Sequence, residues 1–168
     1  MKHIALAALL LPLAACTEAD LAGLFATPPT EAAAPTAAPT LDPTPPPPPP
    51  AGATTADEFD TTSEEDRTAA LASPVAAGGE RRLGETIGSL GDPADPGIWV
   101  KTGYVTELTW GRVEVPSTGA AISLELRPTG GEPGAGAELS LPAMRLLELP
   151  FTALPELVLY ELPGGAPS

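Results

Sequence analysis

The side chains able to carry chemistry are few in this chain, and the first is its single cysteine, Cys16. It follows a short basic start, Lys2 and His3, and the apolar run IALAALLLPLAA at positions 4–15. This order of basic, apolar and small residues is typical of a secretory signal, and the run is shorter than the about 20 apolar residues of a membrane-spanning helix. The sequence therefore predicts a signal peptide over residues 1–15.

The end of that segment, LAAC at positions 13–16, resembles the lipobox of bacterial lipoproteins. The resemblance implies cleavage before Cys16, a diacylglycerol on its sulfur and a fatty acyl chain, such as palmitate, on its new amino group. Several acyl chains hold a protein on a membrane far more firmly than one. Thr17 after the cysteine implies the outer membrane of a Gram-negative cell, with the protein facing the periplasm from the inner leaflet. The alternative is an ordinary signal peptide followed by an incidental cysteine.

Cleavage there removes most catalytic options. His3 is the only histidine, and the chain contains no Asn or Gln. Without an imidazole and with Cys16 acylated, a Cys–His pair, a Ser-His-Asp triad and zinc ligation by histidine are excluded. The net charge changes from −14 to −15 when Lys2 is lost, and such an acidic chain repels nucleic acid. We therefore predict no cofactor, no metal site and no nucleic-acid partner.

The next segment, residues 16–56, is predicted to be a disordered linker rich in proline and alanine. Between positions 17 and 56 it holds 11 prolines, including the run Pro45–Pro50, and no basic residue. Such a segment buries too little apolar surface to offset its conformational entropy, and its proline run favours extended polyproline II. We interpret it as a tether between the lipid anchor and a folded domain. A proline-rich ligand for an aromatic groove on a partner is the alternative.

Residues 57–77 are predicted to form a short helix and a connector. Thr62 and Glu65 have capping-box spacing, Phe59 lies where a hydrophobic staple is expected, and the helix should end before Pro74.

A small β-domain is predicted over residues 78–162, followed by a disordered tail at 163–168. The clearest pattern is a hairpin with alternating side chains around a turn at 116–119. Val113, Val115, Ile122, Leu124 and Leu126 are expected to face inward, and Arg112, Glu114, Ser123, Glu125 and Arg127 outward. The other expected elements are strands at 86–90, 98–105 and 156–161, a glycine-rich loop at 129–137, and a helix capped by Ser140 with Pro142 in its first turn and an apolar stripe of Ala143, Leu146 and Leu147.

This order of elements resembles the carboxy-terminal part of the double-psi β-barrel in the rare lipoprotein A family. The segments that carry the resemblance are LELRPTGG at 124–131 and AELS at 137–140, within residues 112–161. The resemblance implies a mainly β fold, a small double-psi-like barrel with one or two short helices. Many members are envelope lipoproteins that cut peptidoglycan glycan strands.

The family's catalytic aspartate has no counterpart here, because the last aspartate of the chain is Asp95. Breaking a glycosidic bond needs a placed acid and commonly a second carboxylate. The carboxylates available in the domain are Glu107, Glu125, Glu132 and Glu138, and Glu125 is expected on a solvated strand face. We therefore predict no catalytic residue and a non-enzymatic protein. The alternative is a diverged lytic transglycosylase-like enzyme that uses glutamates.

A second stretch, GERRLGETIGSLGDPADPGIWVKT at 79–102, is similar to small alphaproteobacterial envelope lipoproteins without an assigned function. Some of them carry the label galactarate dehydratase, which implies a metal-dependent enzyme several times this length. The chain beyond Cys16 offers neither histidine nor thiol ligands, so the sequence does not support that label.

The sequence thus predicts a lipid-anchored envelope protein whose β-domain binds peptidoglycan or another envelope protein. Trp99, Tyr104 and Trp110 are the candidates for stacking on sugar rings if they are exposed. Core packing is the expected use for at least two of the three.

Overall fold

The computed structural model describes residues 42, 44–72 and 79–163. The predicted signal peptide, Cys16 and most of the linker and tail lie outside the described residues. The elements are α1 (Ala56–Phe59), α2 (Glu64–Leu71), β1 (Arg81–Leu90), β2 (Trp99–Thr102), β3 (Thr109–Val115), β4 (Ala120–Pro128), β5 (Ala137–Leu139), α3 (Leu141–Leu146) and β6 (Glu156–Glu161). Within this part of the chain, no helix has the length and apolar character needed to cross a membrane.

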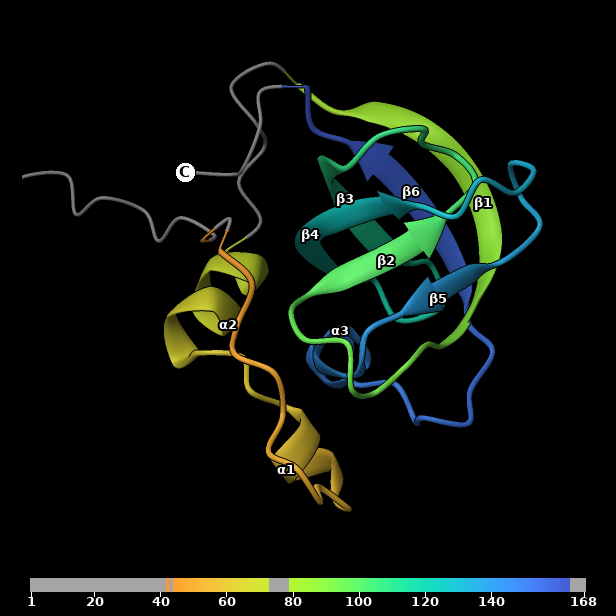
Figure 1. Ribbon diagram of the computed structural model, residues 1–168. Coiled ribbons are helices and arrows are strands. Elements are labelled where there is room, and N and C mark those ends of the chain that lie inside the picture. Colours follow the sequence, from red (N-terminus) through yellow and green to blue (C-terminus); the bar gives the residue numbers. More distant parts are fainter. Residues whose placement is uncertain (1–41, 43, 73–78, 164–168) are drawn as a thin grey trace, which may run out of the picture. The chain divides into compact units, whose positions relative to one another are not determined.

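The six strands close into a barrel in the order β1-β5-β2-β4-β3-β6, which confirms the predicted mainly β fold (Figure 1). The pairs β1–β5 and β2–β4 are parallel, and the other four pairs are antiparallel. Exchanging β1, β2 and β3 for β4, β5 and β6 leaves this order and these directions unchanged. The barrel therefore consists of two interlocked halves of the same topology, the arrangement expected of a double-psi-like barrel.

The hairpin predicted from alternating side chains is confirmed as β3 and β4, which pair from Thr109–Leu126 to Val115–Ala120. Its five expected inward residues are fully buried in the core. Gly111 allows the neighbouring strand β6 to approach β3. A Cβ at this position would lie 2.5 Å from the carbonyl oxygen of Tyr160, so any side chain here would push the two strands apart.

Three strands differ from their prediction. The strand expected at 86–90 is longer, because all of Arg81–Leu90 forms β1, and the one expected at 98–105 shortens to Trp99–Thr102. The three residues of β5, Ala137–Leu139, lie where the sequence predicts the end of the glycine-rich loop and the approach to a helix. Their strand conformation arises from pairing with β1 on one side and β2 on the other.

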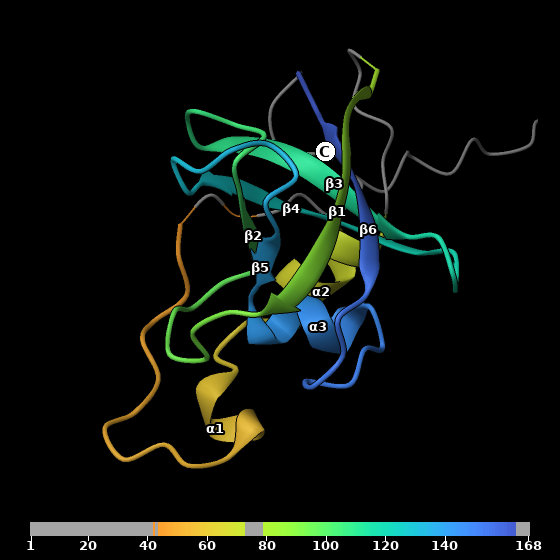
Figure 2. The same ribbon diagram turned by 90° about the vertical axis from the view of Figure 1, so that its right-hand side faces the viewer.

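The helix and strand predicted at the end of the domain are confirmed. Ser140 caps α3, accepting a hydrogen bond from the Ala143 backbone N–H, and Pro142 lies in the first turn. Figure 2 shows α3 at one end of the barrel, where Ala143, Met144 and Leu147 join the core. The closing strand β6 has the predicted bounds, Glu156–Glu161.

The single helix expected after Thr62 is replaced by two short helices. The hydroxyl of Ser63, not that of Thr62, caps α2 by accepting from the Asp66 N–H at 3.0 Å. Thr62 instead directs its backbone N–H to Asp60 Oδ1 at 3.2 Å, which holds it in the connection between the helices. Phe59 ends α1 and is half-buried.

The first two helices are attached to the barrel. Ala69 and Ala70 of α2 have no exposed surface, and α2 packs on β4, where it buries Ser123. The expectation that Ser123 faces solvent is therefore wrong, because a helix covers that face of the strand. Arg145 of α3 also binds Asp60, whose side chain is only 1 % exposed, at 3.2 Å.

Candidate functional site

The proline run lies against the rest of the molecule along one edge. Pro46 and Pro49 are half-buried, whereas the other four prolines of Pro45–Pro50 are exposed. This spacing fits polyproline II, which has about three residues per turn, so one row of rings faces inward. The Thr61 hydroxyl donates to the carbonyl oxygen of Pro47 at 2.6 Å. Figure 1 shows this segment, in orange, running beside α2 and α1. We call residues 44–50 the proline strap.

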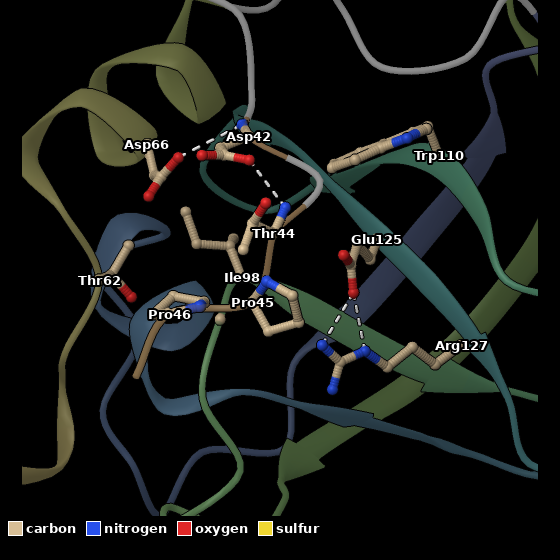
Figure 3. Close-up of a pocket in the computed structure, with 11 residues that line it drawn as sticks. Asp42, Thr44, Pro45, Pro46, Thr62, Asp66, Ile98, Trp110, Glu125 and Arg127 are labelled. Atoms are coloured by element: carbon tan, nitrogen blue, oxygen red, sulfur yellow. Dashed lines mark hydrogen bonds and ion pairs between the residues drawn. The ribbon is translucent and has the colours of Figure 1, made fainter. Parts of the chain in front are cut away.

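A pocket lies beside the proline strap, and the space inside it that water-sized molecules can occupy is about 30 Å³. Figure 3 shows Pro45 and Pro46 among the side chains of its wall, with residues from the helical segment and from the outside of the barrel. We call this pocket and the surface under the proline strap the groove. The lining residues are Asp42, Thr44, Pro45, Pro46, Thr62, Asp66, Gly97, Ile98, Trp110, Glu125 and Arg127.

An ion-pair network forms the barrel side of the groove. Arg127 binds Glu125 through Nε at 2.9 Å and through Nη2 at 2.8 Å, and it binds Asp95 through Nη1 at 3.0 Å. The Glu125 side chain is 13 % exposed. The expectation that Glu125 is a solvated strand residue is therefore wrong, because its side chain is mostly buried in the wall of the groove and is paired with Arg127.

Trp99 lies under the same network. Its indole is fully buried outside the apolar core cluster, with Lys101 Nζ 4.4 Å and the Arg127 guanidinium carbon 5.2 Å from the ring centroid. The indole N–H donates to the Asp95 carbonyl at 3.2 Å. Partial burial alone would raise the pKa of the Asp95 carboxyl, but the hydrogen bond from Lys101 and the charges of Arg127 and Lys101 outweigh it and hold that pKa below its ordinary value.

The opposite side of the groove carries two more carboxylates and an unpartnered hydroxyl. The Asp42 N–H donates to Asp66 Oδ1 at 3.4 Å, and the Thr44 N–H donates to Asp42 Oδ1 at 2.8 Å (Figure 3). Thr62 is 7 % exposed, and its hydroxyl has no hydrogen-bond partner among the described residues. A buried polar atom without a partner is unusual in native proteins, and this one lines the pocket.

The other three glutamates that the sequence offers as candidate catalytic carboxylates lie outside this site. Glu107 and Glu132 are exposed in loops. Glu138 is exposed on β5, and its strand is separated from that of Glu125 by β2, which puts the two strands about 10 Å apart. The structure therefore brings Glu125 together with Arg127 and Asp95, not with another glutamate. Within the described part of the chain, no group of three or more His, Cys, Asp or Glu side chains is arranged to hold a metal ion.

The three aromatic candidates are all used in packing to some extent. Trp99 is buried beneath Lys101 and Arg127, whereas Tyr104 and Trp110 are half-buried and pack on the core. The Tyr104 hydroxyl also donates to the carbonyl of Glu85 at 2.8 Å. Trp110 alone of the three lines the groove.

Comparison with known proteins gives no family for this chain. No family model matches it, and neither the curated proteins nor the solved structures contain a significant match. The site is therefore interpreted from its own geometry.

The sequence indicated Trp110 and Glu125 as separate candidates. It did not indicate that Arg127 joins Glu125 to Asp95, or that the proline strap lies in the same pocket. The signal available for the strap was the unbroken proline run, whose regular conformation can present one edge to a surface. No spacing in the sequence indicated which surface that would be.

Proposed function

We propose that this protein is a lipid-anchored lipoprotein of the bacterial envelope, attached through acyl chains on Cys16. Its β-barrel is a non-catalytic binding domain that faces the periplasm and binds peptidoglycan or another envelope protein. The proposed envelope location and lipid anchor rest on the lipobox-like LAAC at 13–16, and the proposed binding role rests on the groove.

The observation that carries a binding role is the pairing of Glu125. Breaking a glycosidic bond needs an acid that is free to reach the glycosidic oxygen, and commonly a second carboxylate. Here Glu125 Oε2 accepts a hydrogen bond from Arg127 Nε at 2.9 Å and lies 2.8 Å from Arg127 Nη2, so this carboxylate already has a partner within the protein. A paired, half-buried network beside an aromatic ring supports recognition of a ligand rather than proton transfer to one.

Two experiments test the two parts of this proposal. Cys16→Ser should leave the protein unacylated and in the soluble periplasmic fraction, and unchanged membrane association would contradict the anchor. The chain produced from residue 16 should co-sediment with purified peptidoglycan sacculi or crosslink to envelope proteins in cells. Failure of both binding assays would contradict the binding role.

The enzymatic alternative has its own measurement. Incubation of the same protein with sacculi should release no soluble glycan fragments, and Glu125→Gln should change nothing in that assay. Release of fragments that depends on Glu125 would replace the binding role by a transglycosylase-like activity.

A further inference from the structure

We infer that the groove is a recognition site for a proline-rich segment with a lysine or arginine at its amino-terminal end, supplied by another envelope protein. The proline strap occupies this site in cis. This inference rests on the proposed binding function and specifies the chemistry of the partner.

The bound segment itself shows the conformation that the groove accepts. Pro46 and Pro49 face the domain and the prolines between them face solvent, which is how polyproline II segments dock on aromatic grooves. The groove offers the matching apolar wall, since Ile98 is buried there and Trp110 is half-buried. A polyproline II segment has little conformational entropy left to lose when it docks.

The cis occupant is held weakly. One hydrogen bond from the Thr61 hydroxyl reaches the Pro47 carbonyl, and the 3.4 Å contact between the Asp42 N–H and Asp66 is long. About 30 Å³ of space remains beside the proline strap, and the buried Thr62 hydroxyl in its wall lacks a partner among the described residues. A ligand whose carbonyl oxygen lies at this point would accept from that hydroxyl, and proline residues supply such carbonyls.

The groove is acidic, and the segment that occupies it in cis begins with an acidic residue. Asp42, at the start of the docked segment, lies beside Asp66, and Glu125 lines the same pocket. The only cation among the lining residues, Arg127, is already paired with Glu125 and Asp95. A lysine or arginine in the place of Asp42 would meet the opposite charge of Asp66 instead of a like one. The same pocket contains the indole of Trp110, and an indole face favours cations.

The test titrates two synthetic peptides, KPTPPPPPP and DPTPPPPPP, into the chain produced from residue 16, with tryptophan fluorescence as the readout. They differ only at the position of Asp42. Because the strap competes as an intramolecular ligand at an effective concentration of the order of millimolar, the titration also uses Pro46→Ser/Pro49→Ser, which removes the two inward rings. Pro47→Ser/Pro50→Ser is the matched control, since it changes two exposed rings at the same spacing.

The lysine peptide should bind the Pro46→Ser/Pro49→Ser protein at least about tenfold more tightly than the wild type or the control, because the competitor is lost. It should bind about threefold more tightly than the aspartate peptide, a difference that Asp66→Asn should reduce and added salt should weaken. Trp110→Phe should abolish the fluorescence response. Equal affinity for the two peptides, or no saturable binding to the Pro46→Ser/Pro49→Ser protein, would overturn the inference.

A second variant, which keeps both inward prolines of the strap, gives an independent test by peptide titration. Asp42→Lys should make the strap leave the groove more slowly and should weaken binding of the lysine peptide, because the cis occupant then carries the favoured positive charge. Unchanged peptide affinity in Asp42→Lys would count against the inference. If soluble peptidoglycan fragments, and not the peptides, displace the strap, the groove has a glycan ligand; the proposed binding function then survives while this inference fails.

Discussion

Replacement of Arg127 by methionine should destabilise the protein strongly, although the residue lies on the outside of the barrel. The guanidinium holds two carboxylates, Glu125 and Asp95, and contacts the Trp99 ring. Side-chain exposure is 19 % for Arg127 and 13 % for Glu125, so this pair is closer to a buried ion pair than to a surface one. The substitution leaves the Glu125 carboxylate covered and without its cation.

Breaking a fully buried pair by removal of one partner costs about 3–5 kcal/mol, and the residual exposure of this pair reduces the expected loss to about 2–4 kcal/mol. The matched control is Arg81→Met. Arg81 pairs with Glu161, but its side chain is 64 % exposed, so its loss should cost about 0–1 kcal/mol.

The assay is equilibrium urea unfolding followed by tryptophan fluorescence and circular dichroism. With a slope of about 2 kcal/mol per molar urea, within the usual range for small proteins, Arg127→Met should lower the midpoint by roughly 1–2 M. The double variant Glu125→Gln/Arg127→Met should be more stable than Arg127→Met alone, because it no longer buries an unpaired charge. A loss for Arg127→Met no larger than for Arg81→Met would refute this reasoning.

Three further predictions concern the barrel. The pKa of Asp95 is lowered in the folded state, so its ion pairs stabilise the fold above its unfolded pKa of about 3.9. This contribution is lost as the pH falls below that value. Asp95→Asn should therefore flatten the fall in unfolding free energy measured below pH 4. Gly111→Ala should destabilise by about 1–3 kcal/mol in urea, because its Cβ meets the Tyr160 carbonyl, whereas Gly131→Ala, with space around it, should not. Ser140→Ala should cost about 1–2 kcal/mol of unfolding free energy, since this buried hydroxyl caps α3.

The sequence predicted best those elements whose local pattern and tertiary environment agree. Alternation over Thr109–Val115 and Ala120–Pro128 required one buried face, and the barrel supplied it. Ser140 followed by Pro142 indicated the start of α3 because both residues act locally, through a cap and a fixed backbone angle.

The parts that could not be predicted depend on long-range contacts. The strand β5 has only three residues, too few to show a period, and it exists because β1 and β2 lie on either side of it. Ser123 has the polar character of an exposed position, yet α2 covers it. Both outcomes depend on which distant segments the closed barrel brings together.

The candidate site was predictable only as separate residues. Glu125 lies 30 positions from Asp95 along the chain, and no local spacing shows that Arg127 joins them. The boundary predicted at residue 57, between the linker and the short helix, lies after the proline strap, because composition alone gives a proline-rich segment no specific surface to contact. The structure supplies that surface.

The central claim, that the groove of an anchored domain binds an envelope component, is tested most directly by site-specific crosslinking in cells. A photo-reactive amino acid at Asp66, which lines the groove from α2 and stays in place when the strap leaves, is compared with one at Thr118, at the exposed hairpin turn. We expect a covalent adduct with an envelope protein or with peptidoglycan from position 66 and none from position 118, in the membrane fraction. Membrane-associated protein that gives no adduct from position 66, or equal adducts from both positions, would contradict the claim.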